Sequence, residues 1–470
     1  MPSLINWNDF NREIFITDDG EILTYGMIYV DVITLAHLLP KRQLIFLGGY
    51  NDVTTLTAYL ACFEAEAVPL LLDPNLSPYH LSVLLKIYEP KYIFFPTAYV
   101  EIPKIFKVKE IFGNYTLFCN PNEIGPRLNA ELALLLTTSG STGSPKLVRL
   151  SNNNLYSNAK SIIKYLGIDQ NERAITSLPF HYSYGMSVIN SHLLAGASIV
   201  LTNRSFVDPV FWKQMKLHSV TSLSGVPYSY EMLLRFKIER MDLPSLRTMT
   251  QAGGKLSVDN ILRILNICNI KNMRFFTMYG QTEASPRISY LEPECLEEKA
   301  GSIGKAIPGG KLWIEDEHGQ IINAPYQVGE LVYSGPNVAL GYAQCKQDLN
   351  LGDEWGGLLR TGDLASRDAD GFFFIEGRKS RFLKLTGVRV SMDTLEAWFY
   401  RKGITAVALG YDDHLHLIVE SGDPEYIASE IKTFISEMRI HRSTLKFSVV
   451  ATLPRLSSGK VDYFALHKKN

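Results

Sequence analysis

The chain contains 470 residues, and 48 acidic side chains nearly balance 47 lysines and arginines, giving a net charge of −1 at pH 7. This length exceeds what one hydrophobic core usually serves, so two or more domains are expected. The balanced charge excludes the basic footprint that binding of nucleic acid or of an anionic membrane surface requires.

The cysteines and the apolar stretches indicate a cytoplasmic protein. The five cysteines are scattered and have no Cys-x-x-Cys spacing, which predicts neither disulfides nor structural zinc. The N-terminal residues lack the apolar core of a secretory signal. No stretch reaches 18 consecutive apolar residues, so we expect no membrane-spanning helix.

The first 200 residues alternate between short apolar stretches and helix-length segments. Strands are expected at residues 43–49, 67–73, 92–96, 132–138, 173–179 and 197–202. Helix-length segments lie between them, for example at 52–65 and 78–88. Several strands are apolar throughout, which is typical of strands buried on both faces. The alternation predicts α/β layers with largely parallel sheets.

The pattern changes after about residue 300. Residues 310–322 and 328–335 have the pattern of antiparallel strands, with a turn at His318–Gly319. From about residue 381 the chain alternates again between strand and helix patterns over a much shorter length. This last region is predicted to form a small α+β unit.

Residues 137–146, TTSGSTGSPK, follow one of the buried strands and carry almost no bulky side chain. Small side chains leave successive backbone N–H groups uncovered, and Gly140 and Gly143 allow the positive φ angles of an anion-binding nest. The hydroxyl groups and Lys146 add donors and a positive charge, so the loop suits a polyphosphate. It is not a Walker A motif, because Pro145 stands where that motif has glycine. A flexible turn without a ligand is the alternative.

Five more short motifs follow this loop along the chain. They are YGQTE at 279–283, GELVYSGPNVALGY at 329–342, RTGD at 360–363, GRKSR at 377–381 and LSSGK at 456–460. In kind and in order the six motifs resemble those of the adenylate-forming (ANL) superfamily, which comprises acyl- and aryl-CoA synthetases, nonribosomal peptide adenylation domains and luciferases. The pattern is most similar to that of the AMP-dependent acyl and aryl acid ligases.

The resemblance implies the α/β multidomain fold of that superfamily. Residues 1–378 would form a large N-terminal adenylation domain of layered α/β sheets, with a small β-rich subdomain at about 300–378. Residues 381–470 would form a small mobile α+β C-terminal domain. The hinge between them would lie at about 378–381, with Ser380 as the hinge residue.

The resemblance also implies the reaction. A carboxylic acid would attack the α-phosphate of ATP in the presence of Mg²⁺, giving acyl-AMP and pyrophosphate. A phosphopantetheine thiol, of CoA or of a carrier protein, would then take the acyl group as a thioester. The alternatives are an amino-acid-type adenylation domain, a stand-alone ligase that loads an acyl carrier protein, and a catalytically inactive nucleotide-binding relative. The identity of the acid, the acceptor and the oligomeric state, monomer or homodimer, stay open.

The superfamily's functional residues carry over to the matching positions. Lys460 would bridge the attacking carboxylate and the α-phosphate, Glu283 would hold Mg²⁺, and Asp363 would bind the ribose hydroxyls. Arg378 would lie beside Asp363, and Tyr279 would stack on adenine. The implied catalytic residues are Lys460, Glu283, Thr138 and His181. The implied ATP- and AMP-binding residues are Thr138, Ser139, Gly140, Ser141, Thr142, Gly143, Lys146, Gly253, Gly254, Tyr279, Gly280, Thr282, Asp363 and Arg378. Each residue alone also has an ordinary interpretation, such as a turn residue for Asp363 or a surface charge for Lys460.

Residues 177–188 bear on the kind of acid. Relatives that activate amino acids place an aspartate there that pairs with the substrate ammonium, whereas this chain has no acidic residue between Glu172 and Asp208. Burying an unpaired ammonium is costly, because even a neutral polar group costs roughly 2–7 kcal/mol. The stretch from His181 to Gly185 resembles the aromatic gate of acyl- and aryl-CoA synthetases. An aliphatic or aromatic acid is therefore expected, in a pocket lined by His181, Tyr184, Met186, Ser224, Val226, Met278 and Ser285.

Two positions depart from the superfamily pattern in the C-terminal region. Ser380 stands where relatives usually carry an acidic or basic hinge residue, and Tyr463 stands where many have arginine. Gly387 matches the family's thiol channel, where it would allow the backbone to pass close to the pantetheine arm. The two departures leave open how the second half-reaction proceeds.

Overall fold

A computed structural model describes residues 4–99, 101–137, 146–385, 388–438, 441–456 and 459–467. By the contacts between its residues the chain divides into two compact units. The first unit contains Met1–Lys311, Ser334–Leu359 and Ser457–Gly459. The second unit contains Leu312–Tyr333, Arg360–Leu456 and Lys460–Asn470. The boundary expected at 378–381 stays a prediction.

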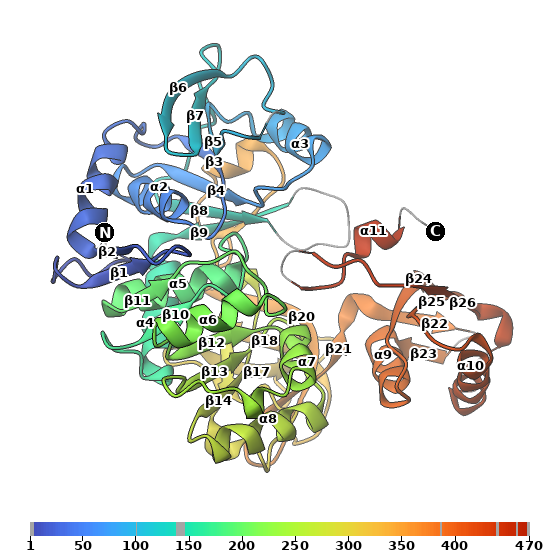
Figure 1. The fold of residues 1–470 in the computed structure, drawn as a ribbon. Coiled ribbons are helices and arrows are strands. Elements are labelled where there is room, and N and C mark those ends of the chain that lie inside the picture. The colour runs from blue at the N-terminus through green and yellow to red at the C-terminus, as the bar shows by residue number, and fades with distance from the viewer. Residues whose placement is uncertain are drawn as a thin grey trace. The chain divides into compact units, whose positions relative to one another are not determined.

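One sheet of the first unit has eight strands in the order β19-β9-β8-β4-β3-β5-β7-β6 (Figure 1). Its strands are β3 (Leu44–Gly48), β4 (Val68–Leu72), β5 (Tyr92–Pro96), β6 (Lys107–Phe112), β7 (Tyr115–Cys119), β8 (Leu132–Thr137), β9 (Leu147–Ser151) and β19 (Gly341–Ala343). The central strands β8, β4, β3 and β5 pair in parallel, and all the others pair antiparallel. The central strands β3 and β4 are buried along their whole length, as their apolar sequences predict.

The other sheet of the first unit has nine strands in the order β16-β15-β14-β13-β12-β10-β11-β1-β2. Its strands are β1 (Glu13–Ile16), β2 (Ile22–Thr24), β10 (Arg173–Ile175), β11 (Ser198–Val200), β12 (Ser222–Gly225), β13 (Thr248–Gln251), β14 (Arg274–Gly280), β15 (Arg287–Leu291) and β16 (Lys305–Ala306). The six strands from β14 to β1 are mutually parallel, whereas β2, β15 and β16 pair antiparallel at the two ends. The expectation of largely parallel sheets is therefore confirmed, and the antiparallel strands lie at the edges.

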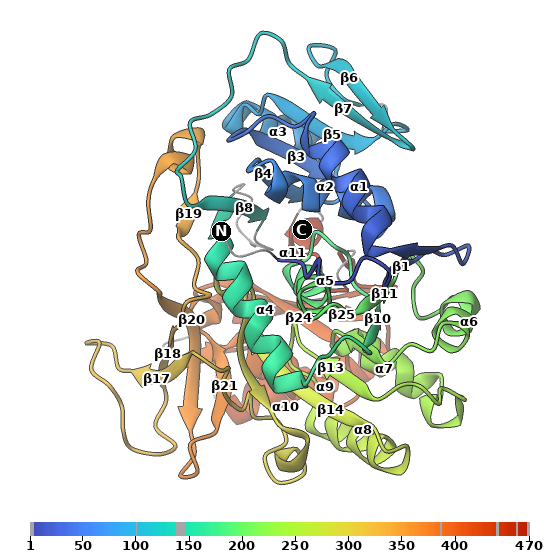
Figure 2. The ribbon, with the colours of Figure 1, turned by 90° about the vertical axis from the view of Figure 1, so that its left-hand side faces the viewer.

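The helices of the first unit begin and end at residues that cap them. Asp52 accepts a hydrogen bond from the Thr55 backbone at the start of α2 (Val53–Glu64). Ser151 and Asn154 form a capping box at the start of α4 (Asn152–Leu166), and Gly167, at φ 66°, ends that helix. Helix α4 packs against α5 (Ser183–Ala195; Figure 2). The other helices are α1 (Tyr25–Ala36), α3 (Pro78–Tyr88), α6 (Pro209–Leu217), α7 (Pro227–Arg235) and α8 (Val258–Ile270).

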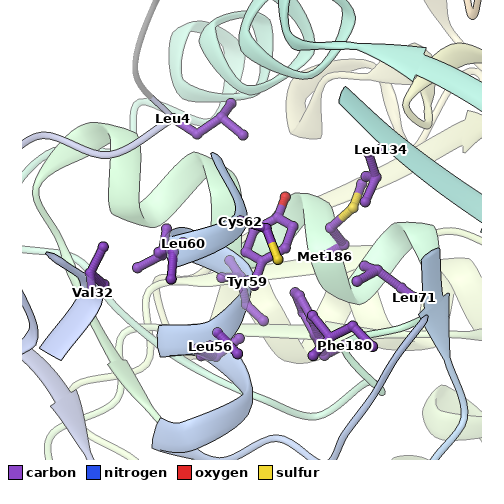
Figure 3. Packing of buried hydrophobic residues seen from close by; sticks show 14 of the residues in the cluster. Leu4, Val32, Leu56, Tyr59, Leu60, Cys62, Leu71, Leu134, Phe180 and Met186 are labelled. Atoms are coloured by element: carbon purple, nitrogen blue, oxygen red, sulfur yellow. The ribbon is translucent and has the colours of Figure 1, made fainter. Parts of the chain in front are cut away.

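The largest hydrophobic core of the first unit is lined by helices α1, α2 and α5 together with strands of both sheets. Tyr59 of α2 meets Phe180 edge to face, with ring centroids 4.8 Å apart. Met186 of α5 lies beside Leu134 and Leu71 of the eight-stranded sheet (Figure 3). This core joins the two sheets into one layered body and fixes the position of α5.

The second unit contains a four-stranded sheet and a smaller α+β part. The sheet has the order β17-β18-β20-β21, with β17 (Lys311–Glu315), β18 (Gly329–Ser334), β20 (Leu358–Arg367) and β21 (Phe373–Arg378). The α+β part contains β22 (Phe382–Leu385), β23 (Val388–Ser391), α9 (Met392–Arg401), β24 (Ala406–Tyr411), β25 (His414–Glu420), α10 (Pro424–Met438), β26 (Leu445–Val450) and α11 (Tyr463–His467). In the described part of the chain its strands pair with one another, as expected for the small α+β unit predicted after residue 381, and its extent as a separate domain stays a prediction. Among the helices that the structure describes, none has both the length and the hydropathy of a membrane span.

Candidate functional site

Three neighbouring parallel strands of the nine-stranded sheet end at one edge, and each continues into predicted site residues. The register pairs Gly225 at the end of β12 with Gln251 at the end of β13, and Gln251 with Thr277 in β14. Val226, Ala252 and Met278 are the residues that follow these three in sequence. The carboxyl edge of a parallel sheet is the usual ligand-binding side of such a fold. The sheet therefore brings three separate sequence motifs together.

Glycines are required where these motifs approach other backbone. A side chain at Gly280 would place its Cβ 1.9 Å from the carbonyl oxygen of Pro286, so no larger residue fits. Gly253 has a φ of 85°, in the left-handed region that favours glycine. The Gln251 side chain donates a hydrogen bond of 2.9 Å to the Gly254 carbonyl and fixes this short loop. The stacking of Tyr279 on adenine beside this loop stays a prediction.

The structure brings Glu283 and Lys146 to one tyrosine. Glu283 lies in η2 (Thr282–Ala284), and its Oε1 accepts a hydrogen bond of 2.8 Å from the Tyr342 hydroxyl. The Lys146 ammonium lies 3.2 Å from the centroid of the Tyr342 ring. Burial raises the pKa of Tyr342, and the negative charge of Glu283 raises it further, so the hydroxyl stays a donor. Strand pairing explains the meeting, because β19 runs antiparallel to β9, which begins directly after Lys146.

The surroundings of Glu283 fit a Mg²⁺ ion that takes one protein carboxylate and fills its other positions with oxygens of water and of substrate phosphates. Among the described residues, no group of three or more histidine, cysteine, aspartate or glutamate side chains is arranged to hold a metal ion. Mg²⁺ usually keeps several waters and takes one or two carboxylates together with substrate phosphates. A single carboxylate meets that description, oriented by a tyrosine that also contacts Lys146 at the end of the predicted polyphosphate loop.

Replacing Tyr342 with phenylalanine is expected to raise the concentration of Mg·ATP needed for half-maximal activity on the order of tenfold. The Glu283 carboxylate would lose the donor that orients it, and one hydrogen bond to a charged group contributes about 1.5–3 kcal/mol. The measurement is initial rate against Mg·ATP concentration. Tyr88→Phe is the matched control, because the Tyr88 hydroxyl donates its hydrogen bond to the neighbouring Ala343 carbonyl instead of to Glu283. An unchanged Mg·ATP requirement in Tyr342→Phe would show that this hydrogen bond has no part in nucleotide binding.

The predicted aromatic gate lies at the start of α5. His181 is half-buried, with Nε2 3.5 Å from Oδ2 of Asp73. Burial lowers the pKa of His181, and the charge of Asp73 only partly opposes this, so the imidazole is neutral near pH 7. The Ser183 hydroxyl lies 3.2 Å from the Thr282 hydroxyl, which links the gate to the YGQTE motif.

Four of the predicted pocket residues lie together beneath this gate. Tyr184, Val226 and Met278 belong to one hydrophobic cluster between α4, α5 and the nine-stranded sheet. The Tyr184 hydroxyl donates a hydrogen bond of 2.9 Å to the Thr250 carbonyl, and the Ser224 hydroxyl lies 2.9 Å from the Thr250 hydroxyl. The cluster is therefore apolar with one buried line of hydroxyl groups.

The structure separates two other predicted pocket residues from this cluster. Met186 points into the core shared with the eight-stranded sheet (Figure 3), because it lies on a different face of α5 from Tyr184. The Ser285 hydroxyl donates a hydrogen bond of 2.8 Å to the Asn337 carbonyl. Residues two apart on a helix do not share a face, so the spacing of Tyr184 and Met186 already separates them once this segment is recognised as a helix.

Asp363 and Arg378 are neighbours in the second unit, as the resemblance implies. They pair across strands β20 and β21, with Arg378 Nε 3.3 Å from Asp363 Oδ1. The Asp363 side chain is 9% exposed and that of Arg378 is 65% exposed, so the carboxylate is held in place and the guanidinium is largely in water. Binding of a ribose by this pair stays a prediction.

Tyr463, one of the departures from the family pattern, contacts the residue after the predicted hinge position. Ser380 lies in η5 (Lys379–Arg381). Arg381 forms ion pairs with Asp393 at 2.6 Å and Glu396 at 2.5 Å, and donates a hydrogen bond of 3.0 Å to the Tyr463 hydroxyl. Tyr463 thus completes a charge network that a second arginine at its position would disturb. Lys460 lies in the preceding loop, where its carbonyl accepts a hydrogen bond from the Leu456 backbone.

Several predicted site residues lie outside the described residues. They are Thr138, Ser139, Gly140, Ser141, Thr142, Gly143 and Gly387. Sequence reasoning in turn missed Tyr342, although it belongs to the stretch GELVYSGPNVALGY that resembles the superfamily.

Known proteins resemble this chain over most of its length. The family model described as AMP-binding enzyme matches residues 6–343. The 2-succinylbenzoate–CoA ligase of Bacillus subtilis (strain 168) is 31% identical over 340 residues, covering 70% of this chain and 67% of that protein. The indoleacetate–CoA ligase of Aromatoleum aromaticum is 31% identical over 369 residues, covering 73% of this chain and 70% of that protein. The structure of the O-succinylbenzoate coenzyme A synthetase from Bacillus subtilis, in complex with ATP and magnesium ion, aligns with a TM-score of 0.76 and 25% identity, covering 97% of this chain and 96% of that one.

Proposed function

Because the chain belongs to the AMP-binding enzyme family and is an AMP-forming ligase of a carboxylic acid and a thiol, we propose that its acid is aromatic or aliphatic and carries no α-ammonium group. The observation that carries this proposal is the charge at the pocket. The buried ionic group beside Tyr184 is the guanidinium of Arg287, whose carbon lies 4.1 Å from the tyrosine ring centroid. A cation at this position repels a substrate ammonium.

The composition of the cluster supports an aromatic acid in particular. Val226 and Met278 offer apolar surface, and the ring of Tyr184 gives a flat wall. Two relatives are named for acids that contain an aromatic ring, 2-succinylbenzoate and indoleacetate. A ring of that kind suits a pocket of large apolar side chains better than a short aliphatic chain does.

In the first half-reaction two anions meet, so the residues must supply positive charge where the new bond forms. The carboxylate oxygen bonds to the α-phosphorus, and the bond to pyrophosphate breaks. We assign Lys460 to the attacking carboxylate and the α-phosphate, and Asp363 to the ribose hydroxyls. Glu283, oriented by Tyr342, would hold the Mg²⁺ that neutralises phosphate charge.

In the second half-reaction a thiol sulfur attacks the acyl carbonyl, and AMP leaves with one oxygen of the original carboxylate. CoA is the proposed acceptor, because two of the relatives are CoA ligases. The phosphopantetheine arm of a carrier protein has the same reactive end and is the alternative. Neutral His181 at the gate would separate the pocket from water until the thiol arrives.

A panel of carboxylic acids tests the proposed substrate class. The protein is incubated with Mg·ATP, CoA and one acid at a time, and the thioester is detected by mass. Arylacetic, arylpropionic and medium-chain aliphatic acids are expected to give thioesters, and the α-amino acids phenylalanine and leucine are expected to give none. Efficient adenylation of an α-amino acid would contradict the proposal. Thioester formation with a phosphopantetheinylated carrier protein but not with CoA would replace the acceptor.

A further inference from the structure

Arg149 is a buried cation on the strand that begins directly after Lys146. It is the middle residue of β9, and its side chain is fully buried. The other four residues of this strand are also buried, and three of them are apolar. A buried ion pair often stabilises a protein no more than well-packed apolar side chains of similar volume do. The arginine is therefore better explained by what it holds in place than by a gain in stability.

The five N–H groups of the Arg149 side chain are matched by five acceptors. These acceptors lie in two segments, one at β19 and one in the loop that follows η4 (Lys346–Asn350). They are the carbonyl oxygens of Leu340, Tyr342, Leu351 and Gly352 and the carboxylate of Glu354. The guanidinium therefore ties strand β19 to the loop at 351–354.

Gly341 leaves the room that this guanidinium needs. It pairs with Arg149 across strands β19 and β9. A Cβ at Gly341 would lie 2.6 Å from Nη2 of Arg149 and 2.7 Å from Oε2 of Glu354, so a side chain there would displace the guanidinium from its acceptors. Gly341 also has a φ of 137°, in the region that favours glycine. The sequence of β19 thus accommodates the arginine at this one position.

The two segments that Arg149 joins are also the ones that hold Tyr342. Arg149 Nε donates a hydrogen bond of 3.0 Å to the Tyr342 carbonyl. The loop continues into Trp355, whose ring meets the Tyr342 ring edge to face with centroids 4.8 Å apart. The same tyrosine donates to Glu283 and carries the Lys146 ammonium over its ring. One residue therefore separates Arg149 from both charged groups of the predicted nucleotide site.

We propose that Arg149 is a positioning residue for Mg·ATP, which holds Tyr342 and, through Tyr342, the carboxylate of Glu283. The inference rests on the proposed function, in which Glu283 holds Mg²⁺, and adds the residue that fixes the donor to that carboxylate. A planar guanidinium suits this task, because its five donors stand in one rigid fork and can hold two segments in one geometry. A lysine ammonium has three donors at a single point and cannot replace it fully.

Calorimetric titration in the absence of an acid substrate tests the proposal. Each variant is titrated with Mg·ATP, with ATP in EDTA, and with AMP. Arg149→Lys and Tyr342→Phe are each expected to weaken the binding of Mg·ATP roughly tenfold, the scale of a lost hydrogen bond to a charged group. The loss should be smaller for ATP in EDTA. The affinity for AMP should be unchanged, because AMP lacks the β- and γ-phosphates that the metal bridges.

A double variant shows whether Arg149 acts through Tyr342. If the arginine serves to hold the tyrosine, Arg149→Lys combined with Tyr342→Phe should bind Mg·ATP about as weakly as the weaker single variant. Independent contributions would instead multiply to a loss of roughly 100-fold. Arg173→Lys is the matched control, because Arg173 also donates to a carbonyl, that of His218, and pairs with Glu13, but on β10 of the other sheet. It should keep the affinities of the unmodified protein.

Each result bears on the proposal in a defined way. An unchanged affinity for Mg·ATP in Arg149→Lys, an equal loss of affinity for AMP, or a loss that multiplies with that of Tyr342→Phe overturns the role of Arg149 and leaves the proposed function standing. An unmodified protein that does not bind Mg·ATP overturns the proposed function and this inference with it. If circular dichroism shows that Arg149→Lys does not fold, Glu354→Ala decides by the same criteria, because it removes the charged partner of the guanidinium at a side chain that is 50% exposed.

Discussion

Lys460→Ala is expected to lower the rate of adenylation by roughly 10²-fold or more and to leave the conversion of supplied acyl-AMP to thioester largely intact. Removing one preorganised donor that stabilises developing charge typically costs this much. The ammonium of Lys460 is assigned to the first half-reaction, in which the carboxylate meets the α-phosphate. In the second half-reaction the thiol attacks acyl-AMP that has already formed, so this charge is no longer required. Pyrophosphate exchange measures the first half-reaction, and thioester formation from synthetic acyl-AMP measures the second.

A second lysine of the same unit is the control for this variant. Lys446 is exposed on β26, so Lys446→Ala removes a positive charge without removing an assigned contact. It is expected to leave both half-reactions unchanged. If Lys460→Ala slows both half-reactions equally, or slows neither, the assignment of Lys460 to adenylation is wrong.

Asp363→Ala is expected to weaken the binding of AMP by roughly 10- to 150-fold. The ribose hydroxyls would lose a charged acceptor, and a hydrogen bond to a charged group contributes about 1.5–3 kcal/mol. Loss of the ion pair between Asp363 and Arg378 is expected to change the stability of the protein little. The Arg378 side chain is 65% exposed, and ion pairs at the surface contribute little free energy. Calorimetric titration with AMP gives the affinity directly.

Asp370→Ala provides the comparison for Asp363. Asp370 is an exposed carboxylate in the turn between β20 and β21, so its removal changes the charge of the same sheet at a different place. AMP affinity should be unaffected by it. An unchanged AMP affinity in Asp363→Ala would remove this residue from the nucleotide site.

The sequence predicts the central strands well because each of them is recognisable from its own residues. Strands such as Val68–Leu72 are apolar throughout, and that property marks burial on both faces. The hairpin of β6 and β7 was missed, because β6 is mostly exposed and its sequence KVKEIF has no apolar run. Strand Arg173–Ile175 is shorter than the predicted 173–179, because the chain leaves the sheet as it turns toward the start of α5. Strands at the edges of a sheet depend on pairing between segments that are distant in the sequence, and the local residue pattern carries no information on that pairing.

The candidate site divides in the same way. Glu283, Asp363 and Lys460 stand in short motifs, so the sequence alone names them. Arg287 and Tyr342 look like an ordinary charged residue and an ordinary aromatic one, and their roles follow from burial and from contacts made across the fold. Tyr342 meets a carboxylate 59 residues away along the chain. No local spacing predicts such a contact.

The most direct test of the central claim follows the oxygen atoms of the acid. An acid that supports thioester formation is labelled with oxygen-18 in its carboxyl group and incubated with the protein, Mg·ATP and CoA, and the nucleotide products are analysed by mass. If the carboxylate attacks the α-phosphate and AMP later leaves with one of its oxygens, the AMP carries one labelled oxygen and the pyrophosphate carries none. Label in inorganic phosphate with ADP as the nucleotide product, or unlabelled AMP, would contradict an acyl-AMP intermediate.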